Sequence, residues 1–348
     1  MWDVIVVGAR CAGAVAALLL ARAGRSVLLV DRARFPRDTV SSRYIEPRGV
    51  GLLRRWGVLG DLVLAGTPVL DRIGDTRLPA PAYAPRRSLL DHLLAKAAVA
   101  AGAVFQDSCT VTGLEFRADR VVGVRHRSQG RELIDRARLV IGADGMRSAV
   151  AAAVRAPLLV NDAPRTCVYY GFYPGAASHP ELYTRSGSWV SAVPTNDGLS
   201  LIQAYWPQDE YPKVRTDVSG AFSAAVKNAS PDLWDRMMTV GRVDRFYGTG
   251  DQRNFFRTAA GPGWALIGDA AHHSDAITAH GITHAFLQAQ LLTDHLPDDL
   301  AHEAALRTAL DLYATQRDPL LRTDYDHTLA IASSLGPITL CQARVSVN

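Results

Sequence analysis

The chain has 348 residues, of which 48% are hydrophobic and 21% charged, as expected for a globular protein with a sizeable core. The net charge is only +4, and nearly all of the basic excess is arginine, since the chain contains three lysines. No run of basic residues is interleaved with aromatic residues, so we do not expect a nucleic-acid-binding surface.

The cysteines and the apolar segments indicate the compartment. The four cysteines are scattered, with none at CxxC spacing, which argues against a zinc site or a disulfide framework. The longest apolar stretch, Cys11 to Ala21, is about half the ~20 residues that a membrane span requires. The opening MWDVIVVGA has no positive region or cleavage site of a signal peptide. We therefore expect a cytoplasmic protein with no membrane span and no metal site.

The amino-terminal segment has the pattern of a β–turn–α–β unit. An apolar run over Trp2–Val7 is typical of a parallel strand that is buried on both faces. A glycine turn follows, then an alanine- and leucine-rich helix over Ala12–Ala23 and a second strand over Ser26–Val30. Such units form parallel sheets covered by helices.

Further elements follow in chain order. Periodicity predicts helices over 47–56 and 86–101, a β-meander from three segments (111–116, 121–125 and 132–135) and a short buried strand over 139–141. Between about 155 and 260, aromatic residues gather in short β-like runs over 167–173, 188–193 and 199–206. An apolar strand returns at Trp264–Asp269, followed by helices to about 332 that are interrupted at Pro319.

These patterns predict an α/β (α+β) fold of two interleaved parts. We expect a Rossmann-like cofactor domain over 1–155 and 261–335. A mainly antiparallel β-sheet domain that binds the substrate is expected over 156–260, and a carboxy-terminal tail over 336–348.

The first motif is the turn Gly8-Ala9-Arg10-Cys11-Ala12-Gly13. It departs from the dinucleotide fingerprint GxGxxG, because Arg10 replaces the middle glycine. The outer glycines keep their roles in the tight turn and in the approach of helix to strand. A pyrophosphate would lie at the helix amino terminus, and the Arg10 side chain would either turn away from it or serve as its counter-charge. Asp31 ends the second strand, where a carboxylate accepts hydrogen bonds from ribose hydroxyls.

Two further motifs are moderately specific by themselves. Gly142-Ala143-Asp144-Gly145 follows a buried strand and could be only a turn with an aspartate helix cap. Gly268-Asp269 follows the strand at 264 and enters a turn of small residues, which suits a carboxylate that binds polyol hydroxyls.

Together, the order and spacing of the three motifs resemble the FAD-dependent monooxygenase superfamily with the para-hydroxybenzoate hydroxylase fold. That superfamily also contains geranylgeranyl reductases and flavin-dependent halogenases. The resemblance spans most of the chain. It implies an ADP-binding fingerprint, an arginine beside the flavin, a helix arginine that reaches the cofactor, and the "DG" and "GD" elements. The cofactor-binding residues it implies are Gly8, Ala9, Arg10, Gly13, Asp31, Arg32, Arg43, Arg87, Val111, Asp144, Gly145, Gly268, Asp269, Gly281 and Ile282.

One segment departs from the family pattern. After the GD element the family commonly has Pro-x-x-Gly-x-Gly, which opens a helix whose N–H groups face the flavin pyrimidine. Here Ala276 replaces the proline, Ala279 replaces the first glycine, and Gly281 remains. The dipole effect needs backbone groups only, so we expect it to be retained.

Histidines cluster after the GD element, where the family places residues beside the flavin. His273, Asp275 and His280 are therefore candidate catalytic residues, with either imidazole as proton donor or substrate orienter. The alternative is that these side chains are solvated or structural. Five aromatics could line an aromatic substrate pocket or belong to the sheet core: Tyr169, Tyr170, Trp189, Tyr205 and Trp206.

The resemblance implies an FAD-dependent monooxygenase that uses NAD(P)H and O2 on a small organic, aromatic or polycyclic substrate. A single dinucleotide fingerprint fits FAD as resident cofactor, with NAD(P)H as transient electron donor or a separate flavin reductase as partner. A flavin-dependent dehydrogenase or reductase without oxygen insertion is the main alternative. A non-catalytic dinucleotide-binding module is another. Halogenases of this fold carry Trp-x-Trp-x-Ile-Pro and a lysine, and the nearest segment here, Trp189 to Pro194, lacks the second tryptophan.

Overall fold

The computed structural model describes residues 1–41 and 43–336, so that 337–348 of the predicted tail lie outside the described residues. A parallel sheet forms the centre of the cofactor-binding half, in the order β17-β8-β1-β2-β5. Its strands are β1 (Trp2–Val7), β2 (Val27–Val30), β5 (Val104–Gln106), β8 (Arg131–Gly142) and β17 (Trp264–Leu266). The short strand β16 (Ala260–Gly261) adds to its edge in antiparallel orientation. The predicted Rossmann-like sheet is confirmed.

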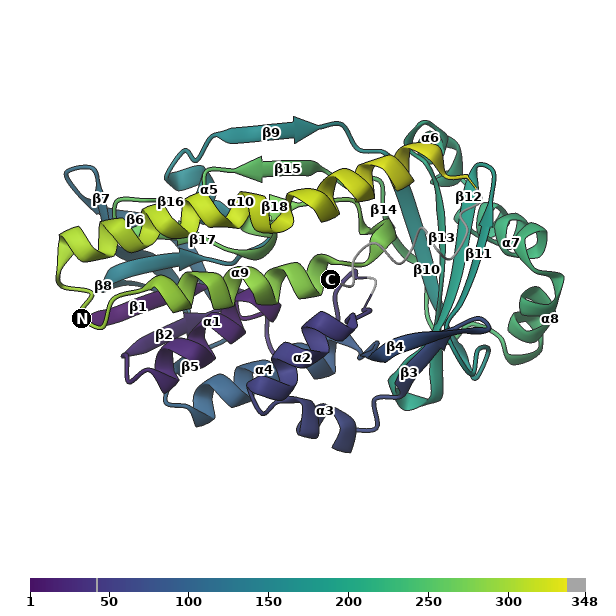
Figure 1. The fold of residues 1–348 in the computed structure, drawn as a ribbon, viewed down its shortest axis with the longest axis horizontal. Coiled ribbons are helices and arrows are strands. Elements are labelled where there is room, and N and C mark those ends of the chain that lie inside the picture. Colours follow the sequence, from purple (N-terminus) through teal and green to yellow (C-terminus); the bar gives the residue numbers. More distant parts are fainter. Residues whose placement is uncertain (42, 337–348) are drawn as a thin grey trace.

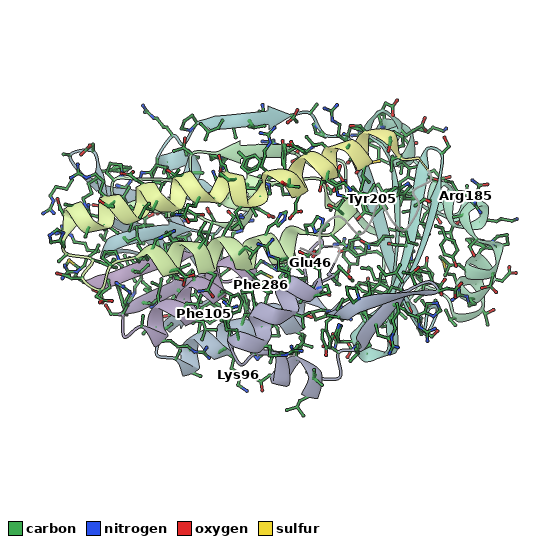
Figure 2. The ribbon with its side chains drawn as sticks, in the orientation of Figure 1. Glu46, Lys96, Phe105, Arg185, Tyr205 and Phe286 are labelled. Atoms are coloured by element: carbon green, nitrogen blue, oxygen red, sulfur yellow. The ribbon has the colours of Figure 1, made fainter. Side chains whose placement is uncertain are left out.

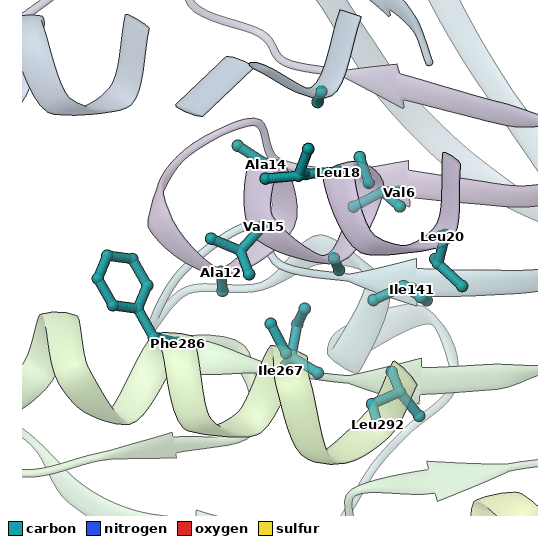
Figure 3. Packing of buried hydrophobic residues seen from close by; sticks show 14 of the residues in the cluster. Val6, Ala12, Ala14, Val15, Leu18, Leu20, Ile141, Ile267, Phe286 and Leu292 are labelled. Atoms are coloured by element: carbon teal, nitrogen blue, oxygen red, sulfur yellow. The ribbon is translucent and has the colours of Figure 1, made fainter. Parts of the chain in front are cut away.

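Three helices cover one face of this sheet: α1 (Cys11–Arg22), α4 (Arg87–Ala100) and α9 (Gly281–His295). Alternate residues of β1 point to opposite faces, so Val4 and Val6 pack against these helices while Ile5 and Val7 face the other side. Figure 3 shows part of this layer, with Leu18 of α1, Phe286 of α9 and Val6 of β1 among the buried side chains of one cluster. The apolar runs at 2–7 and 11–22 form these elements because both faces of the sheet are buried.

A meander covers the opposite face of the sheet. Its strands are β6 (Cys109–Arg117), β7 (Arg120–Ser128) and the first half of β8, paired in antiparallel fashion as predicted. The buried strand predicted over 139–141 is confirmed, but it is not separate from the third segment of the meander, because β8 continues unbroken into the parallel sheet. The apolar end of β8 is buried, while its polar beginning is exposed, and that change of polarity gave the impression of two strands.

An antiparallel sheet in the order β11-β12-β13-β10-β14 forms the other half, which confirms the predicted sheet class. Its strands are β10 (Thr166–Pro174), β11 (Glu181–Arg185), β12 (Ser188–Pro194), β13 (Leu199–Pro207) and β14 (Tyr247–Thr249). Three helices that the sequence did not predict follow β13: α6 (Tyr211–Val214), α7 (Val218–Ala229) and α8 (Pro231–Val240). Phe222 of α7 packs on the outer face of the sheet together with Trp206, so these helices cover that face.

Smaller elements connect the two halves (Figure 1). The helices α2 (Pro47–Arg55) and α3 (Leu59–Leu64) precede a hairpin of β3 (Val69–Ile73) and β4 (Thr76–Tyr83), which was not predicted. Leu70 and Ala82 of the hairpin pack against Val193 of the antiparallel sheet. A third sheet joins β9 (Leu158–Asp162), β15 (Asn254–Arg257) and β18 (His272–His273), and the short helix α5 (Ala149–Ala153) follows β8.

The predicted interruption at Pro319 is wrong. Helix α10 (Glu303–Ser334) continues through the proline and runs along the length of the molecule, from the parallel to the antiparallel sheet (Figure 1). A proline inside a helix costs about 3 kcal/mol. Tertiary packing outweighs that cost, because Leu321 and Tyr325 pack on Phe256 and the buried Arg317 donates hydrogen bonds to the carbonyl of Ala271. Among the described residues, none of the helices has the length and apolarity needed to cross a membrane.

The contact layer between α1 and the sheet provides a first prediction. Leu18→Ala is expected to lower the free energy of unfolding by about 2–5 kcal/mol, because the fully buried side chain leaves a cavity between helix and strands. Urea denaturation measures this loss. The control Leu64→Ala, at an 86% exposed position, should change stability by less than about 0.5 kcal/mol. Equal effects of the two substitutions would contradict the assigned core.

Candidate functional site

A cavity of about 520 Å³ lies at the carboxyl ends of β1, β2 and β8. Its wall contains residues that follow each strand: Gly8 after β1, Asp31 after β2, and Asp144 after β8. The wall continues through the turn after β17 to the first turns of α9. In open α/β sheets, ligands bind at this edge.

Two glycines allow the backbone segments around the cavity to touch. Gly8 has φ +103°, and a Cβ there would lie 2.3 Å from the carbonyl oxygen of Ala143. A Cβ on Gly13 would lie 1.8 Å from the carbonyl oxygen of Gly8. A side chain at position 8 would separate the turn after β1 from the turn after β8, and a side chain at position 13 would separate α1 from the turn after β1. The amino terminus of α1 therefore opens directly into the cavity.

Arg10 explains how the fingerprint tolerates its missing glycine. The residue precedes α1 with φ −88° and ψ −164°, an extended conformation open to any side chain. Its guanidinium lies 2.8 Å from the carboxylate of Asp91 in α4. The same carboxylate also binds Arg87, at the start of α4, at 2.9 Å. Burial alone would lower the pKa of Arg87, and the Asp91 carboxylate raises it. Two guanidinium groups share one carboxylate, so a net positive charge faces the cavity beside the α1 amino terminus.

Asp31 shapes the turn as well as the cavity. One of its carboxylate oxygens accepts the N–H of Ala9 at 2.8 Å, and the other accepts the N–H of Ala33 at 2.8 Å. Arg32 and Val111 line the same end of the cavity. Ala9 and Gly13 lie behind the wall and act through backbone geometry.

The DG and GD turns form the middle of the wall. Ser148 caps α5 by accepting the N–H of Ala151, and the Asp144 carboxylate supports this cap by accepting the N–H of Ala149 and the hydroxyl of Ser148. Gly145 and Gly268 both have positive φ and line the cavity. Asp269 is exposed on the wall, and its charge also raises the pKa of Arg87.

The loop before α9 contains a left-handed turn at an alanine. Ala279 has φ +60°, a left-handed conformation that glycine adopts without strain. Gly281 and Ile282 follow, both in the cavity wall, and start α9. The amino termini of α1 and α9 thus lie in one cavity, where their free N–H groups favour negative charge.

Arg43 does not line the cavity. It has φ +62°, is 1% exposed, and its guanidinium lies 3.2 Å from Asp38. The same group lies over the rings of Tyr170 and Phe172, at 5.2 and 4.9 Å from their centroids. Arg43 therefore connects the cofactor half to the inner face of the antiparallel sheet.

The three candidate catalytic residues occupy different positions. His273 lines the cavity, and its Nδ1 contacts the carbonyl of Arg253. Asp275 is buried behind the wall, where it accepts the N–H and hydroxyl of Thr166 and holds the loop on the antiparallel sheet. Burial raises the pKa of the Asp275 carboxyl. His280 also lies behind the wall, with its Nδ1 3.2 Å from Glu46.

Comparison with known proteins defines the family. The family model of an FAD binding domain matches residues 1–327. The chain belongs to the FAD binding domain family. The resemblance deduced from the three motifs is thereby confirmed.

Relatives of this family member have several activities. A digeranylgeranylglycerophospholipid reductase of Methanosarcina mazei is 28% identical over 303 residues, covering 82% of this chain and 72% of the relative. A 1H-pyrrole-2-carbonyl-[peptidyl-carrier protein] brominase of Pseudoalteromonas luteoviolacea is 22% identical over 82% of this chain and 74% of the relative. The structure of a probable FAD-dependent monooxygenase from Pseudomonas aeruginosa superimposes with a TM-score of 0.81, at 22% identity over 96% of each chain. The last likeness establishes the fold alone.

Sequence reasoning missed the partners that orient these groups. Asp91 had a usable signal, because it follows Arg87 by four residues on one helix. His284 follows His280 by the same spacing and lines the cavity with His272. Glu46 and Asp324, which bind His280 and His284, lie far away in the chain and carry no local signal.

The strained loop yields a prediction. Ala279→Gly is expected to raise the free energy of unfolding by up to about 1 kcal/mol, because glycine adopts the left-handed conformation without strain from a Cβ. Chemical denaturation measures the change. The control Ala224→Gly, exposed in the middle of α7, should lower stability by about 1 kcal/mol. A loss of stability in both variants would show that Ala279 carries no strain.

Proposed function

We propose that this family member is a monooxygenase that uses FAD, a reduced nicotinamide and O2 to hydroxylate or oxidise a small aromatic or polycyclic molecule. When bound, FAD supplies the redox chemistry that couples the nicotinamide to oxygen. The observation that carries the cofactor assignment is the single cavity into which the amino termini of α1 and α9 both open. Two such termini suit an elongated ligand with a negative charge near each of them.

The residues of the cavity fit the chemical groups of FAD. The α1 amino terminus, with the net charge of Arg10, Asp91 and Arg87, would hold the pyrophosphate. Asp31 would accept hydrogen bonds from ribose hydroxyls, and Val111 would contact the adenine. Asp269, exposed further along the wall, would bind the hydroxyls of the ribityl chain.

The five aromatic residues of the antiparallel sheet belong to hydrophobic clusters, and none of them lines the cavity, so they are sheet core and the aromatic class of the substrate rests on the resemblance. The alternation of β10 and β13 places Tyr170 and Tyr205 on clusters that face inward, whereas Trp206 packs outward on α7. Tyr169 likewise packs on the outer cluster and Trp189 on an inner one. The Arg43 guanidinium over Tyr170 adds a cation to this inner face.

His273 is the proposed proton donor or substrate orienter. It is the member of the predicted catalytic set that lines the cavity. Its contact with the carbonyl of Arg253 fixes the ring, so the other nitrogen is available toward the cavity. Asp275 and His280 are proposed to position the loop and its charge.

Halogenation is disfavoured by the positions of the lysines. All three, Lys96, Lys213 and Lys227, are exposed on helices, and Figure 2 shows Lys96 at the outer edge of the molecule. Trp189 is buried, and its indole N–H donates to the carbonyl of Gly336. Among the described residues, none of the three lysines lines the cavity, which supports an activity other than halogenation.

A reductase is the second candidate, favoured by the 28% identity to the digeranylgeranylglycerophospholipid reductase. Oxygen discriminates between the two. With NADH or NADPH, or with a separate flavin reductase, a monooxygenase turns over a substrate only in air, and one atom of isotopically labelled O2 enters the product. Equal turnover under anaerobic conditions without oxygen incorporation would establish the reductase instead.

The turn at Gly8 tests the cofactor site directly. Gly8→Ala is expected to weaken FAD binding by at least about tenfold, because the new Cβ would lie 2.3 Å from the Ala143 carbonyl and would distort the pyrophosphate turn. Titration of the apoprotein with FAD, followed by flavin absorbance, measures the affinity. The control is Gly51→Ala in α2, where the new Cβ would have no neighbouring atom within 4 Å. This substitution should leave the affinity for FAD unchanged. A wild-type protein that ignores added FAD would overturn the whole proposal.

A further inference from the structure

Two histidine–carboxylate pairs lie side by side at the start of α9. The Nδ1 of His280 lies 3.2 Å from Glu46 of α2, and the Nε2 of His284 lies 3.0 Å from Asp324 of α10. The two imidazole rings are stacked, with centroids 5.4 Å apart and planes 21° apart. His284 lines the cavity, and His280 lies directly behind it. Figure 2 shows Glu46 near the centre of the molecule.

A third imidazole and several charges surround these pairs. The ring of His272, on β18, meets that of His284 edge-on at 5.4 Å and also lines the cavity. The Nε2 of His272 and the Nδ1 of His284 are buried and have no hydrogen-bond partner among the described residues. The other charged or titratable groups around the pairs are Tyr44 and Arg48 near the carboxylates, and Arg317, His273 and Tyr325 near His272.

The surroundings separate the imidazoles into charged and neutral ones. Burial would lower the pKa of His280, but the hydrogen bond and the charge of Glu46 raise it above the usual value. Burial, together with the charges of its neighbours, lowers the pKa of His272 well below that value. The hydrogen bond from His284 lowers the pKa of Asp324, which keeps that carboxylate ionised. The proton is therefore held at the α9 amino terminus and excluded from His272.

We propose that the pairs His280–Glu46 and His284–Asp324 act as one unit that places a titratable positive charge behind the ring end of the cavity. This charge adds to the amino-terminal dipole of α9 and favours the negatively charged, reduced form of the flavin ring. This role of the two pairs rests on the proposed function, in which FAD occupies the cavity. His280 is a positioning residue, because it acts through His284 and not by direct contact.

The charge has a defined dependence on pH. Because the pKa of His280 is raised in the folded protein, the imidazolium is fully present below the ordinary histidine value of about 6.5. The imidazolium loses its proton as the pH rises through the raised pKa of His280. Below that transition the reduced flavin is stabilised, and above it the Glu46 carboxylate is left uncompensated.

The test is the two-electron reduction potential of the bound FAD, measured against reference dyes between about pH 5.5 and 8.5. At the acid end, His280→Gln is expected to shift the equilibrium toward oxidised flavin by about tenfold, or about 30 mV. At the alkaline end the two potentials should converge. Glu46→Gln should move the wild-type transition to lower pH, because the imidazole loses the carboxylate that raises its pKa.

His295→Gln is the matched control, at the carboxyl end of the same helix and outside the cavity wall. It should leave both the potential and its pH dependence unchanged. If the reduction potentials of wild type and His280→Gln run parallel across the pH range, or if His295→Gln shifts the potential as much as His280→Gln does, the inference is overturned. FAD affinity is measured in each variant, so that loss of the cofactor, which would contradict the proposed function, is distinguished from a potential that ignores the histidine pair.

Discussion

The close approach of two backbone segments is the constraint on which the cofactor half depends. Gly8 touches the carbonyl of Ala143, and Gly13 touches the carbonyl of Gly8, with no room for a Cβ at either point. These contacts bring the turn after β1, the start of α1 and the turn after β8 to a common edge. The cavity exists because the three segments meet there, and the helix amino terminus that faces it is a consequence of the same contacts.

Charge is distributed along the cavity in two arrangements of carboxylates with basic side chains. At one end, Arg10 and Arg87 share Asp91, which leaves one positive charge beside α1. At the other end, the stacked pairs built on Glu46 and Asp324 flank the amino terminus of α9. In both places a buried carboxylate fixes a cation next to a helix amino terminus, so that side-chain charge and helix dipole act in the same direction.

Backbone conformation decides which glycines of the family pattern this chain can replace. The middle glycine of the fingerprint is replaceable because Arg10 has an extended backbone and its side chain has a buried partner. At position 279 this chain has an alanine in place of the family's glycine, and that alanine keeps a left-handed backbone conformation at a cost in strain. Gly8 has no such freedom, since its φ is positive and a carbonyl oxygen occupies the space of a Cβ.

Local patterns in the sequence predicted four of the five parallel strands, α1, α4 and the antiparallel sheet, because buried runs and glycine turns determine those elements over short distances, whereas the three-residue strand β5 was missed. Long-range packing decided what was missed. Pro319 lies inside a helix because Phe256 of β15 and Ala271, in the turn before β18, hold that helix in place, and no local pattern in the sequence predicts those contacts. The candidate site divides in the same way: glycines and aspartates of the motifs were found from their spacing, whereas Glu46 and Asp324 reach their histidines only through the tertiary fold.

One cavity is proposed to recognise a whole dinucleotide, from the adenine near Val111 to the flavin ring near α9. Competition binding to the apoprotein tests this recognition, with FAD, ADP and FMN compared by quenching of tryptophan fluorescence. FAD is expected to bind, ADP to compete with it for the α1 end, and FMN, which lacks the adenosine half, to bind much more weakly. FMN binding as tight as that of FAD, or FAD binding that ADP does not affect, would show that the cavity does not recognise the whole dinucleotide.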